Sequence, residues 1–322
     1  MNGGRTTRRS VLAAGVGLAA LGAAACTAGP ERPRRTEPLA FGVSTPGGPQ
    51  ATGELEAVAA VAGERPSLVL SYVALAAPPP LADLDAVAAR GATPMVTWEP
   101  WDPADGSRST LADLAAGVWD GQLWWWAGAL RDWGRPVLLR FAHEQNGDWY
   151  PWAVGVAGTT AEDHVAAWRH LAEVFDRAGA GNVELVWNPN VRYAGSTPMA
   201  ETWPGTGSVD RVALDGYNWG AVPGHGGWQE PAELFGPSLD ELRGLAGGLP
   251  RLVAEVGCAE SGGDKARWVT DLVAWLDAQA DVGAFVWFDH DKETDWRLAS
   301  SPASARAVRR ALADRSLVGS RR

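Results

Sequence analysis

The sequence lacks the motifs that several large enzyme classes require. No glycine-rich phosphate loop opens a helix after the first predicted strand, which argues against a dinucleotide-binding sheet. No Gly-x-Ser-x-Gly elbow is present, which argues against a serine hydrolase. His143-Glu144 begins like a zinc-helix motif, but Gly147 stands where the second histidine is needed. We therefore expect neither a metal nor an organic cofactor.

Cysteine and basic charge are also scarce. Only Cys258 lies in the part of the chain expected to fold, so no internal disulfide is available there, and we expect it to be a small buried residue. Lys and Arg total 28 against 38 Asp and Glu, which gives a formal net charge of −10. Removing residues 1–25 would make the chain more acidic, because they contain arginines and no acids. This balance argues against nucleic acid as a partner and suits a neutral glycan.

Tryptophan, by contrast, is abundant. The chain has 18 Trp against 4 Tyr and 6 Phe, within a hydrophobic fraction of 46% that is ample for a core. Many of these indoles will be buried, but an excess of them is typical of a glycan-binding cleft, where apolar sugar faces stack on the rings.

The N-terminus reads as a targeting segment. Arg8-Arg9 forms a twin-arginine region, and the apolar run Val11–Ala25 is too short to span a membrane permanently. Ala24-Ala25-Cys26 resembles a lipoprotein cleavage site, with Cys26 as the lipidated residue. We expect export by the twin-arginine route, with the protein outside the cell and anchored to the cell membrane as a lipoprotein. The alternative is plain secretion with Cys26 incidental.

Four segments follow from this division. Residues 1–25 are the signal peptide, 26–38 a Pro- and Arg-rich tether, 39–315 the folded domain and 316–322 a basic tail. Nothing in the sequence suggests more than a monomer.

Eight apolar or β-branched runs alternate with helical patterns in the folded domain. This alternation predicts a parallel sheet, and eight units at this length predict a single closed (β/α)8 TIM barrel. The helix between the fifth and sixth strands is poorly marked. The expected strands are 39–44, 67–73, 94–98, 137–143, 183–188, 209–216, 251–255 and 283–288, and the expected helices are 53–62, 81–90, 111–132, 161–178, 239–245, 265–278 and 303–313.

Reactive residues of a barrel lie where its strands end, at the carboxyl face. The fourth strand ends at Glu144, and an extended backbone would place Arg140, Ala142 and Glu144 on one face. The seventh strand puts Glu255 at the end of an apolar run. The less specific alternatives are that Glu144 only pairs with Arg140, and that Glu255 caps a helix or forms an ion pair.

Other strand ends supply further candidates. Tyr217, after the sixth strand, can donate its hydroxyl to a carboxylate, although a core-edge tyrosine is an alternative. His143 is either structural or orients the neighbouring acid. We also expect substrate contacts from Trp98, Trp149, Trp219, Trp287, Asn218, Asp215 and Arg140.

Three motifs together resemble glycoside hydrolase family 26, which groups β-mannanases with some mixed-linkage glucanases and β-1,3-xylanases. They are Arg140-Phe-Ala-His-Glu-Gln-Asn-Gly-Asp-Trp149, Leu214-Asp-Gly-Tyr-Asn-Trp219 and Ala254-Glu-Val-Gly257. The resemblance implies that Glu144 is the general acid/base and Glu255 the nucleophile. It also implies that His143 and Tyr217 position these carboxylates, and that Trp149 and Trp287 contact sugar.

The resemblance implies a retaining endo-β-glycosidase acting by double displacement, most simply on β-1,4-mannan or glucomannan. Two positions depart from the family pattern: Gln145 replaces a frequent Met, and Phe288 replaces an Arg that often follows the tryptophan in mannanases. Mixed-linkage β-glucan, β-1,3-xylan and an envelope glycan therefore stay open as substrates. A non-catalytic glycan-binding lipoprotein is the alternative of another class.

Overall fold

The computed structural model describes residues 37–102 and 105–315. The predicted signal peptide at 1–25, the predicted lipidation site Cys26, most of the predicted tether and the tail at 316–322 lie outside these residues. Among the helices that are described, none is both long and apolar enough to cross a bilayer.

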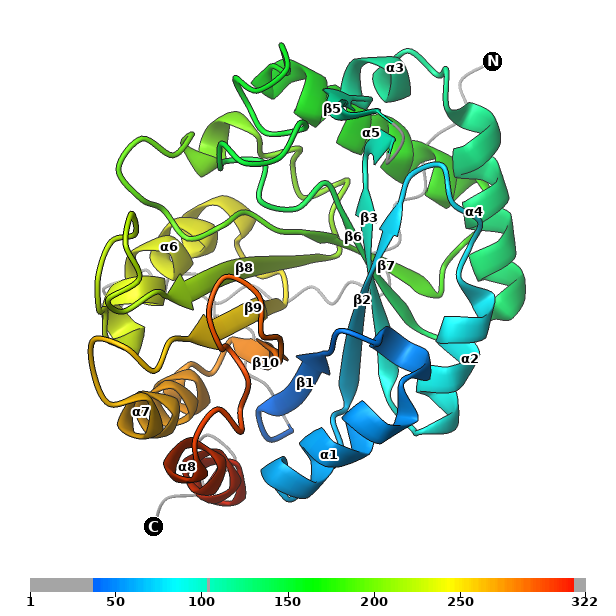
Figure 1. The fold of residues 1–322 in the computed structure, drawn as a ribbon. Helices are drawn as coiled ribbons and strands as arrows, with labels where there is room; N and C mark the ends of the chain where they lie inside the picture. The colour runs from blue at the N-terminus through cyan, green and yellow to red at the C-terminus, as the bar shows by residue number, and fades with distance from the viewer. Residues whose placement is uncertain (1–36, 103–104, 316–322) are drawn as a thin grey trace, which may run out of the picture. The chain divides into compact units, whose positions relative to one another are not determined.

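Eight parallel strands close into a barrel, in the order β1-β10-β9-β8-β7-β6-β3-β2, and the helices surround them (Figure 1). The predicted (β/α)8 barrel is confirmed, and each predicted strand overlaps an observed one. The strands are β1 Ala40–Ser44, β2 Leu68–Ala74, β3 Thr93–Glu99, β6 Val137–Phe141, β7 Val183–Trp187, β8 Arg211–Asn218, β9 Arg251–Cys258 and β10 Val282–Phe288.

The helices also follow the predicted alternation, with differences that have local causes. They are α1 Thr52–Ala62, α2 Leu81–Ala89, α3 Leu111–Ala115, α4 Asp120–Trp133, α5 Ala161–Arg177, α6 Pro231–Ala246, α7 Lys265–Ala278 and α8 Pro302–Ala313, besides the short 3-10 turns η1 Gly48–Gln50 and η2 Met199–Glu201.

Two predicted helices had the wrong extent. The stretch expected as 111–132 is two helices, because Gly117 adopts a left-handed φ of 80° between them. The helix expected at 239–245 is the C-terminal half of α6, which begins at Pro231. A capping box between Glu230 and Glu233 starts α6 there. The strands β4 (Trp101–Asp102) and β5 (Asp105–Ser109) form an unpredicted antiparallel hairpin.

The weakly marked segment between β7 and β8 forms no α-helix among the described residues. It contains only η2 and irregular loop. This long loop lies at the carboxyl ends of the strands, the side on which a barrel of this kind places its site.

Side chains alternate between two hydrophobic layers. One cluster, which includes Leu70, Met95, Leu138 and Val186, has its members spread over the barrel strands. A larger cluster joins strands to the surrounding helices. Trp98 belongs to this outer layer.

The expected sugar contacts of Trp98 and Trp287 are wrong in this structure, because both indoles are fully buried. Trp98 stacks on Trp126 of α4 with ring centroids 4.2 Å apart. Trp287 packs edge-on against Trp268 of α7 and donates its ring N–H to the carbonyl oxygen of Trp296, 2.9 Å away. Both rings point outward from the strands, toward helices, so they hold the barrel and its helical layer together.

We expect Trp98→Ala to destabilise the fold by about 3–5 kcal/mol, because the substitution leaves a cavity between β3 and α4. Trp125→Ala is the matched control: Trp125 is 51% exposed on α4, and its loss should change stability by at most about 0.5 kcal/mol. Urea denaturation followed by circular dichroism measures both. Equal stability of the two variants would contradict the buried placement of Trp98.

Candidate active site

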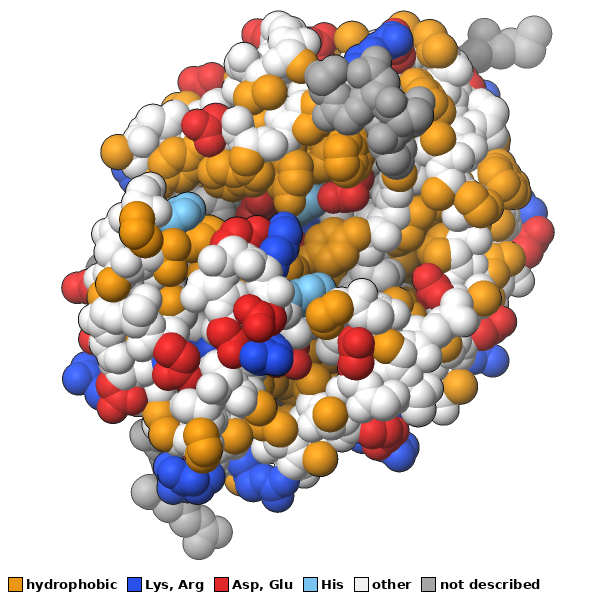
Figure 2. Space-filling model, viewed as in Figure 1, with side chains coloured by type: hydrophobic (Ala, Val, Ile, Leu, Met, Phe, Trp, Pro, Cys, Tyr) orange, Lys and Arg blue, Asp and Glu red, His pale blue; other side chains and the backbone are white. Residues whose placement is uncertain are grey.

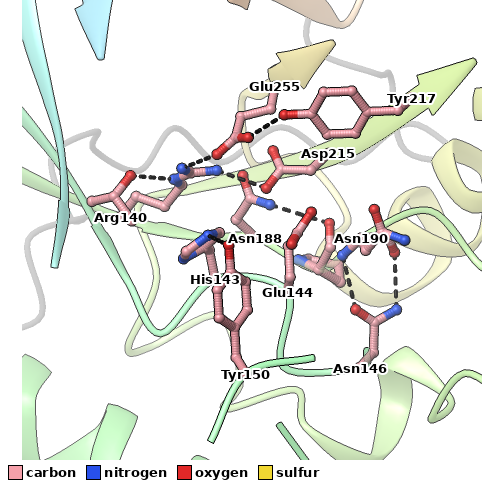
Figure 3. A network of polar contacts seen from close by, with 12 residues as sticks. Arg140, His143, Glu144, Asn146, Tyr150, Asn188, Asn190, Asp215, Tyr217 and Glu255 are labelled. Carbon is pink, nitrogen blue, oxygen red and sulfur yellow. Dashed lines mark hydrogen bonds and ion pairs between the residues drawn. The ribbon is translucent and has the colours of Figure 1, made fainter. Parts of the chain in front are cut away.

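Arg140 lies at the centre of a polar network inside the barrel (Figure 3). Its side chain is fully buried, and its Nε donates to Thr97 Oγ1 of β3 at 2.8 Å. Its Nη1 donates to Asp215 Oδ2 of β8 at 2.7 Å, and its Nη2 donates to Glu255 Oε1 of β9. One guanidinium on β6 therefore joins three other strands.

The charges of this network stabilise one another. Burial alone would lower the pKa of Arg140, but the neighbouring Asp215 and Glu255 raise it well above its usual value. Burial raises the pKa of Asp215 well above its usual value, and Arg140 opposes only part of that rise. We nevertheless assign Asp215 as ionised, because its 2.7 Å contact to Nη1 of Arg140 is a charge-assisted hydrogen bond. Arg140 and Asp215, both expected to bind substrate, are fully enclosed and bind each other.

Glu255 reaches this network because β9 is irregular. The pairing of β8 with β9 shifts by one residue: Leu214 pairs with Val253, but Asp215 pairs with Glu255. Regular alternation would place Glu255 on the face opposite to Ala254. The bulge instead turns Glu255 toward Arg140, beside Asp215.

Tyr217 donates its hydroxyl to Glu255 Oε2 at 2.5 Å. Burial and the charge of Glu255 raise the pKa of Tyr217 well above its usual value, so the phenol stays protonated as a donor. Glu255 therefore accepts from a guanidinium on one oxygen and from a phenol on the other, so both oxygens of its carboxyl group are held in place. This is the contact expected of Tyr217.

Glu144 stands in a tight turn after β6 rather than on an extended strand. Its φ is 52° and that of Ala142 is 47°, both in the left-handed region that non-glycine residues rarely adopt. The backbone N–H of Glu144 donates to the carbonyl oxygen of Asn188 at 2.7 Å. The expectation that Arg140 and Glu144 share a face through strand alternation is thus wrong, although both reach the same site. Arg140 is paired with Asp215 and Glu255 instead.

The turn is clamped to the loop after β7. The side-chain amide of Asn146 donates to the carbonyl oxygen of Asn190 at 2.9 Å, and its oxygen accepts the N–H of Asn190 at 2.8 Å. Gln145, one of the two residues that depart from the expected pattern, is buried and donates to Thr202 Oγ1 at 3.1 Å. These amide contacts offset the backbone strain at Glu144.

The carboxyl group of Glu144 has an environment unlike that of Glu255. Burial raises the pKa of Glu144 to about 8, the charge of Glu255 adds to the rise, and the Trp149 hydrogen bond partly opposes it. That bond runs from Trp149 Nε1 to Glu144 Oε2 over 2.7 Å. Two carboxyl groups therefore share one site, and Glu255 is the one that Arg140 pairs with directly.

His143 is buried and neutral, because burial and the charge of Arg140 lower its pKa well below the usual value. Its Nε2 lies 3.2 Å from the hydroxyl of Tyr150, and its backbone oxygen accepts the indole N–H of Trp152 at 2.7 Å. Within the described residues it has no hydrogen bond to either glutamate. A role in orienting the acid would therefore act through the turn that His143 shares with Glu144.

The remaining predicted contacts differ in how much of each side chain is exposed. Asn218 is fully buried, and its side-chain oxygen accepts the backbone N–H of Gln229 at 3.1 Å, so it shapes a loop instead of meeting sugar as expected. Trp219 is half-buried beneath His225, with parallel rings 3.5 Å apart. Trp149 is 46% exposed. Cys258 is buried as expected, and burial raises its pKa to about 12.

Sequence reasoning missed two residues at this end of the barrel. The ring of Tyr72, from β2, lies 5.7 Å from the Arg140 guanidinium, and burial together with the nearby Glu255 raises the pKa of its hydroxyl well above the usual value. Glu99, at the end of β3, accepts the ring N–H of Trp101 at 3.2 Å, and burial raises its pKa. Both follow apolar runs at strand ends, the same signal that identified Glu144 and Glu255.

Figure 2 shows the surface hollowed over the middle of the barrel, with hydrophobic, acidic, basic and histidine side chains around the hollow. His143, Glu144 and Asp215 each offer a possible metal-ligand atom there, within 4.8 Å of one another. Asp215, however, already pairs with Arg140, and the adjacent guanidinium would repel a metal ion. The cluster suits proton and sugar chemistry better than it suits a cation.

Comparison with known proteins shows what the chain is similar to. Residues 120–258 match the model of glycosyl hydrolase family 26. Endoglucanase H of Acetivibrio thermocellus is 38% identical over 233 residues, which are 71% of this chain and 25% of that protein. Mannan endo-1,4-beta-mannosidase A and B of Caldalkalibacillus mannanilyticus is 35% identical over 92 residues, 26% of this chain and 17% of that protein. The chain thus spans a quarter or less of each relative.

A solved structure shares the fold. The catalytic domain of a family 26 endo-β-1,4-mannanase from Bacillus sp. JAMB-750 superposes with a TM-score of 0.62, covers 86% of both chains and is 17% identical. At that identity the likeness speaks for the fold alone. Residues 120–258 of this chain are thus similar to glycoside hydrolase family 26, and its barrel is similar to that of a family 26 mannanase.

Proposed function

We propose that the protein is a retaining β-glycosidase that hydrolyses a β-linked polysaccharide at internal bonds. The observation that carries the proposal is the contrast between two coupled carboxyl groups. Burial and Glu255 raise the pKa of Glu144 to about 8, while Arg140 and Tyr217 both donate to Glu255. An acid kept protonated beside an ionised carboxylate is the pair that glycoside hydrolysis needs.

The reaction would proceed in two displacements. Glu255 attacks the anomeric carbon as Glu144 gives its proton to the departing oxygen, so that a glycosyl ester of Glu255 forms and the leaving sugar is released. Glu144 then takes a proton from water, whose oxygen attacks the same carbon and frees Glu255. The two inversions give net retention of the anomeric configuration.

For the substrate, we infer a neutral β-linked glucan ahead of mannan. Phe288 stands where related mannanases often carry Arg, and it packs against Tyr217 and His290 with ring centroids 5.7 and 3.9 Å away. That position therefore offers no cation to a neighbouring sugar. The similarity to a relative named endoglucanase also covers far more of this chain than the similarity to the mannosidase. Mannan, glucomannan and β-1,3-xylan are the other members of the test panel.

We expect Glu144→Gln and Glu255→Gln each to lower kcat/KM on the polysaccharide by at least about 10²–10⁴-fold, because each removes a group from the reaction itself. Glu173→Gln, which changes an exposed glutamate on α5, should retain full activity. Reducing-sugar release from barley mixed-linkage glucan, β-1,4-mannan, glucomannan and β-1,3-xylan is the measurement. Proton NMR of the first-formed anomer tests retention. Activity that survives in Glu255→Gln would refute the mechanism.

The pH profile should follow the proton on Glu144. Because the raised pKa of about 8 keeps this acid protonated below that value, kcat/KM should be level near neutrality and fall as pH rises past about 8. The pH dependence of the folding stability should report the same carboxyl group. The unfolded chain ionises Glu144 near its ordinary pKa, so the stability of the wild type should decrease between about pH 4.5 and 8 relative to Glu144→Gln. An alkaline limb that remains in Glu144→Gln on an activated aryl glycoside would assign that limb to another group.

We further propose export by the twin-arginine route and anchoring through a lipid on Cys26. The support is the Arg8-Arg9 pair, the apolar run after it and Ala24-Ala25-Cys26. Cys26→Ala should move the protein from the membrane fraction to the soluble exported fraction, and mass spectrometry of the mature N-terminus should detect the lipid in the wild type only. Equal distribution of both forms would favour plain secretion.

A further inference from the structure

An exposed aromatic surface continues from the proposed acid toward α6. Trp149 is 46% exposed, and Tyr193, in the loop after β7, is 39% exposed. Their ring centroids lie 5.8 Å apart with planes tilted by 30°. Large exposed rings that lie together are unusual on a solvated surface and mark places where ligands bind.

Both rings are held in place before any ligand arrives. The Trp149 indole lies directly over Gly147, where a Cβ would come within 2.6 Å of the ring, and its N–H is bonded to Glu144. The Tyr193 turn is closed by Ser196, whose hydroxyl accepts the N–H of Tyr193 at 3.1 Å and donates to its carbonyl oxygen at 2.9 Å. Aromatic rings that are already ordered lose little entropy on binding.

Beyond Tyr193 the surface dips into a shallow hollow of about 540 Å³. One wall is the loop with Arg192, Tyr193 and Ala194, and the other is the start of α6 with Glu233, Leu234 and Pro237. The backbone of Arg192 is anchored to α6 by a 2.8 Å bond to the buried Ser238 hydroxyl. The two walls are therefore fixed to each other.

The hollow offers both donors and acceptors. Pro237 lies inside α6 and has no N–H, so it cannot give the carbonyl oxygen of Glu233 the usual helical hydrogen bond. The Arg192 guanidinium and the Tyr193 hydroxyl are donors on the opposite wall. Burial and the nearby Asp148 and Glu144 raise the pKa of Tyr193, so its hydroxyl stays protonated. An aromatic face with mixed polar groups around it fits a neutral pyranose.

The position of Trp149 assigns this surface to one side of the cleaved bond. In the proposed reaction Glu144 protonates the oxygen of the departing sugar, and Trp149 is bonded to Glu144. Glu255, which would carry the glycosyl unit, is held instead by Arg140 and Tyr217. A sugar that leaves past Glu144 would meet Trp149 first and Tyr193 next.

We propose that Tyr193 and the hollow beside it form a subsite for a neutral pyranose on the leaving-group side of the glycan, beyond the sugar that contacts Trp149. This inference rests on the proposed hydrolase function. It gives the enzyme a reason to prefer long chains, because each additional unit on that side gains a stacking contact.

The test compares two substrates in the wild type, Tyr193→Ala, Tyr193→Phe and Trp125→Ala. One substrate is a β-linked hexasaccharide of the polymer that the wild type cleaves. The other is an aryl glycoside of the same sugars whose small phenol leaving group cannot reach Tyr193. We expect Tyr193→Ala to lower kcat/KM about tenfold on the hexasaccharide, mostly through KM, and to leave the aryl glycoside unchanged.

The controls separate the ring from the fold. Tyr193→Phe, which keeps the ring, should retain most of the hexasaccharide activity, and Trp125→Ala, an exposed indole on α4, should match the wild type on both substrates. Equal values of Tyr193→Ala and wild type on the hexasaccharide, or equal losses on both substrates, would overturn the subsite.

A wild type inactive on every substrate would refute the proposed function instead. Binding of two β-linked hexasaccharides, one a mixed-linkage glucan fragment and one a β-1,4-mannan fragment, would then decide the subsite by itself when followed by tryptophan fluorescence. Weaker binding by Tyr193→Ala than by Trp125→Ala would support it, and equal binding would overturn it.

Discussion

The buried guanidinium of Arg140 is the interaction on which the site depends. A charge inside a barrel is costly unless it is paired and hydrogen-bonded, and Arg140 meets both conditions with Thr97, Asp215 and Glu255. Those partners come from three different strands. The same contacts that make the charge tolerable therefore fix the relative positions of β3, β6, β8 and β9 at the end of the barrel where Glu144 and Tyr217 stand.

The structure places strain next to that rigid network. Ala142 and Glu144 both adopt left-handed backbone conformations, which cost about 1–3 kcal/mol each in a non-glycine residue. The carbonyl oxygen of Asn188 holds the turn in this form, together with the two hydrogen bonds between the Asn146 side chain and the Asn190 backbone. Glu144 lies near enough to Glu255 for the charge of Glu255 to raise its pKa, so the strained turn belongs to the arrangement that brings both carboxyl groups into one site.

The positions of the strand ends were predictable from the sequence, but the directions in which their side chains point were not. Apolar runs that end in a carboxylate identified Glu144 and Glu255, because the reactive residues of a barrel lie at the carboxyl ends of its strands. The direction of the Glu255 side chain depends on a bulge at Ala254, and that of the Glu144 side chain depends on a strained turn. Neither feature leaves a periodic signal in the sequence. Trp98 and Trp287 were misassigned for a related reason: an indole near a strand end can face either the site or the helices, and only packing against Trp126 and Trp268 decides.

The two carboxyl groups are also coupled in a way that suits both halves of the proposed reaction. The negative charge of Glu255 is one of the causes that raise the pKa of Glu144, so the acid holds its proton while Glu255 is free. When Glu255 becomes a neutral glycosyl ester, that repulsion disappears and the pKa of Glu144 must fall. Glu144 is then better suited to remain ionised and to accept a proton from water. The nucleophile would thus switch its neighbour from acid to base by losing its own charge, without movement of the backbone.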